Sequence, residues 1–231
     1  MPLLILWDID HTLIENSGVS KEIYAAAFAS VIGHPPHAPV RTGGRTDRAI
    51  MSDLFRRNGL AEPGWETTRQ ALTEAGAAHF EALQSRGWAL PGARSALEAV
   101  DRELGMISSV LTGNIAPNAR VKLAAFGLDD LVNLSIGAYG ADSVDRFSLV
   151  GTALARARTA LGLLGDTPVV LIGDTPRDVE AALLTGSHVI AVATGIHTVQ
   201  ELSKAGADHV LDDLTGTGAL LDHLRDLRAH S

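Results

Sequence analysis

Short apolar runs that end in polar residues recur along this chain and alternate with segments of helical period. The first run, Leu3-Leu4-Ile5-Leu6-Trp7, leads without a break into Asp8 and Asp10. A continuous apolar run of this length is typical of a parallel strand that is buried on both faces. Similar runs near 106–111 and 168–173 also end in polar residues. The alternation predicts an α/β fold: a parallel sheet with helices on both faces and right-handed crossovers.

The expected elements fall into two groups. Between residues 15 and 88 the pattern has helical period, broken by stretches rich in glycine and proline, and from residue 91 onward strands alternate with helices. Strands are expected near 106–111, 131–136, 168–173, 188–193 and 208–211. Helices are expected near 21–32, 46–57, 65–86, 93–104, 117–126, 147–162, 176–185, 198–205 and 217–229. We therefore predict a doubly wound, Rossmann-like α/β core made of residues 1–14 and 89–231, with residues 15–88 as a helical insert after the first strand.

Composition and charge narrow the range of partners. The chain has 231 residues, of which 46% are hydrophobic, and a formal net charge of −8, so it can bury a large core. The negative charge argues against nucleic acid or an anionic membrane as the main partner. The absence of cysteine excludes disulfides and thiolate metal sites. Because no apolar run approaches about 18 residues and no basic stretch precedes the first one, we expect a cytoplasmic protein, monomeric or homodimeric, without a signal peptide or membrane span.

Asp8 and Asp10 lie at the carboxyl end of the first expected strand, where open α/β sheets hold their ligands. Two carboxylates that are this close repel each other unless a cation or a shared proton separates them. A site made of oxygen ligands alone suits Mg²⁺. The residues alone leave open a simpler interpretation, in which the pair only caps the following segment.

Two later motifs have the same arrangement of a strand followed by polar residues. They are Val110-Leu111-Thr112-Gly113-Asn114 and Gly173-Asp174-Thr175-Pro176-Arg177-Asp178. The hydroxyl and backbone N–H groups of the first can hold phosphate oxygens at a helix start, although an ordinary strand-to-helix turn is the alternative. Asp174 is expected to reach the same edge of the sheet as Asp8. Asp178 fits a metal site, directly or through water, and it also fits the third position of a helix that Thr175 caps; both roles can hold together.

In this order the three motifs resemble those of the haloacid dehalogenase superfamily of phosphohydrolases, and most closely its phosphoglycolate phosphatase-like branch. The resemblance covers nearly the whole chain and implies a Mg²⁺-dependent phosphatase that acts through an aspartyl-phosphate. It implies that Asp8 is the nucleophile and that Asp10 is the general acid and base, with a backbone carbonyl that also binds the metal. Asp174 and Asp178 are the other metal ligands that it implies.

The residues next to these aspartates refine the expected reaction. By resemblance, Asp10 favours phosphoester hydrolysis over dehalogenation. Thr12 favours a phosphatase over the mutase branch, where valine is usual, and is a candidate substrate-binding residue. His11 replaces the common glycine, which changes the adjoining loop.

A cationic side chain should balance the charge on the transferring phosphoryl group. The superfamily has lysine or arginine at the start of a later helix. Arg146 is our candidate for this catalytic role, because Lys122 and Lys204 lie in other segments. The alternative for Arg146 is a solvated surface arginine.

By the same resemblance, residues 15–88 are a cap that closes over the crevice, excludes water and contacts the substrate beyond its phosphate. The segment 41–48 resembles the specificity region of related caps, and Arg45 is a candidate to bind a second anion; a solvated helix start is its alternative. The implied substrate is a small phosphomonoester such as phosphoglycolate. Two other functions stay open: a phosphosugar mutase of the same superfamily, and a non-catalytic module that binds a small molecule.

Overall fold

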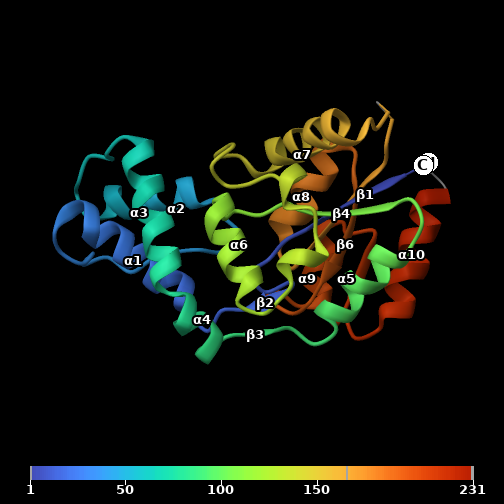
Figure 1. Ribbon diagram of the computed structural model, residues 1–231, viewed down its shortest axis with the longest axis horizontal. Coiled ribbons are helices and arrows are strands. Elements are labelled where there is room, and N and C mark those ends of the chain that lie inside the picture. Colours follow the sequence, from blue (N-terminus) through green and yellow to red (C-terminus); the bar gives the residue numbers. More distant parts are fainter. Residues whose placement is uncertain (1, 165, 230–231) are drawn as a thin grey trace.

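In the described parts of the chain, five parallel strands form the main sheet (Figure 1). The structure is a computed structural model that describes residues 2–164 and 166–229. The strands, in their spatial order, are β4 (Met106–Val110), β1 (Leu3–Trp7), β5 (Val169–Gly173), β6 (His188–Val192) and β7 (His209–Leu211). All five residues of β1 are buried, as expected for a strand between two parallel neighbours. The predicted α/β fold with a parallel sheet is confirmed.

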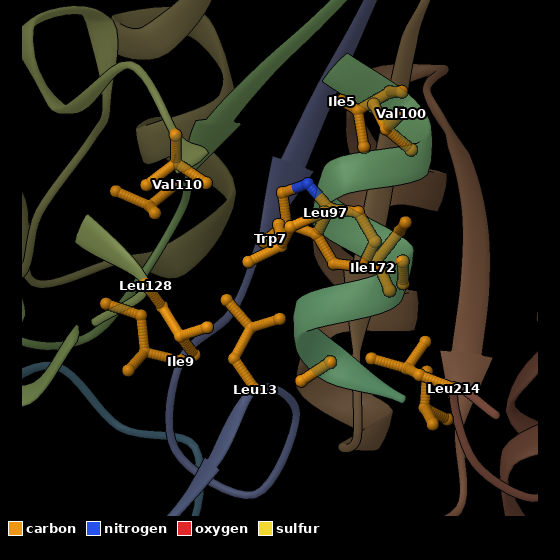
Figure 2. Packing of buried hydrophobic residues seen from close by; sticks show 14 of the residues in the cluster. Ile5, Trp7, Ile9, Leu13, Leu97, Val100, Val110, Leu128, Ile172 and Leu214 are labelled. Carbon is orange, nitrogen blue, oxygen red and sulfur yellow. The ribbon is translucent and has the colours of Figure 1, made fainter. Parts of the chain in front are cut away.

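Helices cover both faces of this sheet. On one face α5 (Ala93–Arg102), α6 (Ala116–Ala124) and α10 (Thr217–Ala229) share an apolar cluster with the odd-numbered residues of β1. On the other face α7 (Arg146–Leu161), α8 (Pro176–Thr185) and α9 (Val199–Ala205) pack against its even-numbered residues. Figure 2 shows Trp7 beside Leu97 of α5, within the first cluster. The indole Nε1 of Trp7 donates to Ser108 Oγ at 2.8 Å, which satisfies its polar atom inside the core.

The helical insert, residues 15–88, lies at one end of the molecule (Figure 1). It contains α1 (Val19–Ile32), α2 (Asp47–Arg57), α3 (Trp65–Ala78) and α4 (Phe80–Arg86). The chain enters and leaves it through a short antiparallel pair, β2 (Ile14–Glu15) and β3 (Trp88–Ala89), which the apolar pattern did not predict. The insert has its own apolar cluster, and Ile115 and Ala125 from the segment around α6 belong to that cluster as well. Apolar packing therefore joins the insert to the α/β part of the chain.

Two predicted elements are wrong. The strand expected at 131–136 is replaced by two short 3-10 helices, η1 (Asp129–Leu131) and η2 (Leu134–Ile136). The side chain of Asn133 accepts from the backbone N–H of Ser135 at 3.1 Å, and this local hydrogen bond competes with a strand ladder. The single helix expected at 65–86 is divided at His79, where the imidazole Nδ1 contacts the carbonyl oxygen of Ala75 at 2.7 Å.

No helix within the described parts of the chain is both long and apolar enough to cross a membrane.

Candidate active site

The chain turns sharply after β1, and this turn separates Asp8 from Asp10. The backbone N–H groups of Leu13 and Ile14 donate to the carbonyl oxygen of Ile9 at 2.9 and 3.0 Å. His11 has a φ of 61°, in the left-handed region that favours glycine. A residue other than glycine in this conformation costs of order 1 kcal/mol and is held by its surroundings. Here the carbonyl oxygen of His11 accepts from Thr194 Oγ1 at 2.5 Å.

Three buried carboxylates meet at the end of the sheet. Asp8 follows β1, Asp174 follows β5 and Asp178 lies in the first turn of α8; one oxygen of each lies within 4.8 Å of the others. Glycine makes this approach possible, because a Cβ on Gly195 would lie 1.9 Å from Asp174 Oδ2. A Cβ on Gly173 would likewise lie 2.3 Å from the carboxyl carbon of Asp178. These glycines therefore leave room for the carboxylates.

Arg146, the first residue of α7, lies among these carboxylates rather than at the surface. One guanidinium nitrogen is 2.9 Å from Asp8 Oδ2, and Nε donates to Asp178 Oδ1 at 2.9 Å. Its side chain is only 7% exposed. Burial alone would lower the pKa of Arg146, but the carboxylates of Asp178 and Asp8 outweigh burial and raise it. Arg146 is therefore charged and held in place by the cluster.

The charges of the cluster fit a divalent cation. Three carboxylates and one guanidinium leave two negative charges when all are ionised. Burial raises the pKa of Asp8 to about 6, against the opposing effect of Arg146 and with a further rise from Asp178. Burial, followed by Asp178 and Asp8, also raises the pKa of Asp174 well above its usual range. A divalent cation with oxygen ligands would relieve this conflict, and the donor set suits Mg²⁺.

Asp178 caps the helix as expected and also lies among the clustered carboxylates. Its Oδ2 accepts from the backbone N–H and the hydroxyl of Thr175 at 3.0 and 2.7 Å, which completes a capping box at the start of α8. Its Oδ1 accepts from Arg146. Thr12 is fully buried behind the cluster, with its hydroxyl 3.4 Å from Asp174 Oδ1.

The segment Thr112-Gly113-Asn114 follows β4 and faces the same space. Thr112 Oγ1 accepts from the side-chain amide of Asn114 at 2.8 Å. A Cβ on Gly113 would lie 2.3 Å from the carbonyl oxygen of Arg45, so glycine is required where the insert approaches this loop. This loop therefore packs directly against the backbone of the helical insert.

Asp47, at the start of α2, fastens the insert to this loop. Its backbone N–H donates to the carbonyl oxygen of Gly113 at 2.7 Å. Its carboxylate accepts from the backbone N–H of Ile115 at 2.8 Å and from Tyr24 Oη at 2.6 Å. Asp47 is 1% exposed, and burial raises its pKa to about 6 although the hydrogen bond from Tyr24 and the charge of Lys122 oppose this. No motif in the sequence predicts a role for Asp47 or Tyr24.

Asp10 has a different partner from Asp8. Lys122 Nζ lies 2.8 and 2.7 Å from the two carboxylate oxygens of Asp10, and 2.6 Å from Asn114 Oδ1. Burial would raise the pKa of Asp10, but the ammonium of Lys122 outweighs it and lowers this pKa to about 2. The sequence places Lys122 in another segment than the one expected to supply the cation. One signal was available: Asn118 and Lys122 are polar residues one turn apart on a helix with apolar neighbours.

These groups surround a cavity of about 320 Å³. From the α/β part of the chain it is lined by Asp8, Asp10, Thr112, Gly113, Asn114, Arg146 and Asp174, and from the insert by Lys21, Tyr24 and residues 42–45, among others. Arg45 lies in this wall, but its guanidinium donates to the carbonyl oxygen of Ala49 at 2.9 Å and lies 3.5 Å from Asp53. Thr12 and Asp178 are buried and do not line the cavity. The structure thus gathers the predicted aspartates, the Thr112 loop and Arg146, and gives the guanidinium of Arg45 other partners.

Comparison with known proteins agrees with this arrangement. The family model of haloacid dehalogenase-like hydrolases matches residues 5–183, and a model of HAD-hydrolase-like proteins matches residues 150–217. Among curated proteins, no significant match is found.

Three solved structures are similar over nearly the whole chain. A hydrolase from Pseudomonas syringae is 26% identical, with a TM-score of 0.68 over 98% of this chain and 99% of its own. A predicted phosphoglycolate phosphatase from Haemophilus somnus 129PT is 19% identical, with a TM-score of 0.65 over 94% and 97%. A putative β-phosphoglucomutase from Bacteroides vulgatus is 18% identical, with a TM-score of 0.65 over 98% and 90%. At these last two identities the likeness concerns the fold.

Proposed function

Because this chain belongs to the haloacid dehalogenase-like hydrolases, we propose that it is a Mg²⁺-dependent phosphatase that hydrolyses a small phosphomonoester. One observation carries the proposal: Asp8 lies in the wall of a cavity, inside a buried cluster whose ionised groups leave two uncompensated negative charges. A cluster of this kind needs a divalent cation, and a phosphate ester would bring a matching anion to it.

The aspartates divide the reaction between them. Asp8 attacks phosphorus through a carboxylate oxygen, the bond from phosphorus to the ester oxygen breaks, and an aspartyl-phosphate forms. Asp10 protonates the departing alcohol, then takes a proton from the water that cleaves the aspartyl-phosphate. Water attack at phosphorus releases inorganic phosphate and restores the carboxylate of Asp8.

The remaining groups bind the phosphoryl group and the metal. Asp8 and Asp174 would hold Mg²⁺ through carboxylate oxygens, with the backbone carbonyl of Asp10 beside them and Asp178 acting through water. When bound, this ion neutralises phosphoryl charge and orients the phosphate. Arg146 supplies a further positive charge, since its guanidinium contacts Asp8 directly.

The phosphate oxygens are bound by the loop after β4. Thr112 and Gly113 offer a hydroxyl and a backbone N–H at the cavity wall, and the side-chain amide of Asn114 holds Thr112 in place. Thr12 supports Asp174 from behind.

The size of the cavity and the insert beside it limit the substrate. A cavity of about 320 Å³ is at the small end of ligand sites and suits a metabolite of few atoms. We propose that residues 15–88 act as a cap that contacts the part of the substrate beyond the phosphate, because Lys21 and Tyr24 line the cavity from this side. Phosphoglycolate is one candidate, in line with the name of a structural neighbour.

A phosphate-release assay tests the proposal. The panel contains phosphoglycolate, sugar phosphates and nucleoside monophosphates, each with Mg²⁺ and with a chelator. We expect release of inorganic phosphate that requires Mg²⁺ and is fastest with a small ester. Isomerised sugar phosphate without free phosphate would instead establish a mutase. Tight binding of an ester without turnover would establish a binding module.

A further inference from the structure

Lys122 is a buried lysine that the reaction as described does not use. It lies in α6, its side chain is 2% exposed, and it is one of only three lysines in the chain. Burying an ammonium group is costly unless it is paired and hydrogen-bonded. The partners of this ammonium group therefore indicate its role in the site.

The ammonium of Lys122 has three close oxygen partners. They are Asp10 Oδ1 and Oδ2, at 2.8 and 2.7 Å, and Asn114 Oδ1, at 2.6 Å. Arg146, the other buried cation of the site, contacts Asp8 and Asp178. The two cations therefore pair with different carboxylates, and the carboxylate that Lys122 contacts is that of Asp10.

Lys122 also determines which way the amide of Asn114 points. An ammonium only donates hydrogen bonds, so it must face the amide oxygen. The amide nitrogen is then directed to Asp10 Oδ2 and to Thr112 Oγ1, both at 2.8 Å. One cation thereby orients the carboxylate after β1 and two polar groups of the loop after β4.

Asp10 is held from the insert side as well, yet it still faces the cavity. Asn16 Nδ2 donates to Asp10 Oδ1 at 2.7 Å, and the Ser20 hydroxyl lies 3.3 Å from the same oxygen. The side chain of Asp10 is 24% exposed and lies in the cavity wall. Removing Lys122 would leave hydrogen bonds from flexible or neutral groups only, and the carboxylate could turn away from its position.

On the basis of the proposed phosphatase function, we propose that Lys122 is a positioning residue, whose ammonium fixes Asp10 and Asn114 in the orientation needed for proton transfer at the cavity. Proton transfer needs donor and acceptor within about 2.6–3.2 Å, so a small rotation of Asp10 is enough to slow it. Lys122 itself does not contact the substrate in this role. Its removal should therefore lower kcat and leave KM almost unchanged.

A double-mutant cycle tests this role. The variants are Lys122→Met, which keeps the length of the side chain but not its charge, Asp10→Asn, and the two combined. Lys204→Met, at an exposed position of α9, is the matched control. Each protein is assayed with an alkyl phosphate and with p-nitrophenyl phosphate, whose leaving group needs little protonation.

We expect Lys122→Met to lower kcat for the alkyl phosphate by about 10²-fold, with KM changed by less than about threefold. The loss should be smaller with p-nitrophenyl phosphate, as for Asp10→Asn. The double variant should be no more than about twofold slower than Asp10→Asn alone, because the two residues act as one unit. Lys204→Met should match the wild type.

Three results would overturn the role of Lys122 while the phosphatase function stands. They are wild-type kcat in Lys122→Met, an equal loss with both esters, and losses that multiply in the double variant. If Lys122→Met does not fold, the double variant is compared with Asp10→Asn, because the double variant removes both buried charges together. A double variant that is much more than twofold slower than Asp10→Asn would then overturn the role of Lys122. A wild type that is inactive with every ester would instead refute the proposed function, and the role of Lys122 with it.

Discussion

Asp8 and Asp10 leave the same strand two residues apart, yet their surroundings are opposite. Asp8 lies with two other carboxylates and shares Arg146 with Asp178. Asp10 has Lys122 to itself and accepts further hydrogen bonds from neutral groups. Accordingly, the pKa of Asp8 rises to about 6 by burial, while Lys122 overcomes burial and lowers the pKa of Asp10 to about 2.

The difference shows how one strand end can provide two kinds of acid group. A carboxylate with too few cations around it favours the binding of a metal ion. A carboxylate with its own lysine is held in one orientation. The turn at His11 makes this possible, because it sends the two side chains to different neighbours.

The largest expected effect separates the two aspartates by their chemistry. Asp8→Asn removes the nucleophile, and we expect kcat to fall by at least about 10⁴-fold, measured as phosphate release with saturating Mg²⁺. Asp101→Asn, an exposed change on α5, is the control and should keep full activity. Turnover by Asp8→Asn above about one per cent of wild type would contradict a nucleophilic role.

The two sites should also differ in stability. Asp10→Ala leaves the buried ammonium of Lys122 without its carboxylate, and we expect the free energy of unfolding to fall by about 3–5 kcal/mol. Asp8→Asn removes one of three mutually repelling carboxylates, so without metal it should raise this free energy. Urea unfolding in the presence of a chelator measures both, with Asp101→Ala as a control that should change it by less than about 0.5 kcal/mol. Equal losses in the two variants would remove the contrast.

Another buried carboxylate, that of Asp47, sharpens the comparison because it lies outside the carboxylate cluster and forms no salt bridge with a described lysine. Its pKa in the folded protein, about 6, lies above its ordinary value of 3.8, so the folded state binds this proton more tightly. The free energy of unfolding should therefore fall as pH rises from about 4 to about 6, by up to about 3 kcal/mol from this group.

The variant Asp47→Asn isolates that contribution. The stability of the wild type relative to this variant should decline between pH 4 and pH 7, as measured by urea unfolding at each pH. Asp101→Asn, in a solvated position, should follow the wild-type profile. A constant difference between wild type and Asp47→Asn across this range would show that burial does not hold a proton on Asp47.

Much of this site follows from local sequence, and the rest follows from packing that no local pattern encodes. The strand ends that carry Asp8 and Asp174 could be predicted because the apolar runs before them are continuous. Arg146 could be predicted because it lies at the start of an expected helix. Lys122 could not, since its bond to Asp10 depends on how α6 lies across the end of β1.

The errors in secondary structure have a related cause. The segment 131–136 has the apolar residues of a strand. However, the side chain of Asn133 accepts from the backbone N–H of Ser135, and this bond favours a short helical turn over a strand. Strands β2 and β3 have only two residues each, which is too few to show an alternation of apolar and polar residues. Local hydrogen bonds and very short pairings therefore escape an analysis of periodicity.

The smallest expected effect concerns Arg45, which lies in the cavity wall but has a guanidinium engaged by the insert itself. Since that group donates to the carbonyl oxygen of Ala49 and lies 3.5 Å from Asp53, it has little left to offer a substrate anion. We expect Arg45→Gln to change KM for phosphoglycolate by less than about threefold, whereas Arg45 as a main anion ligand would require a loss of about tenfold or more. Arg48→Gln, in the first turn of α2 with its guanidinium over Trp65, is the matched control for loss of a positive charge from this part of the insert. A large rise in KM confined to Arg45→Gln would mean that Arg45 leaves Asp53 when substrate binds, and that the insert supplies a cation to the site after all.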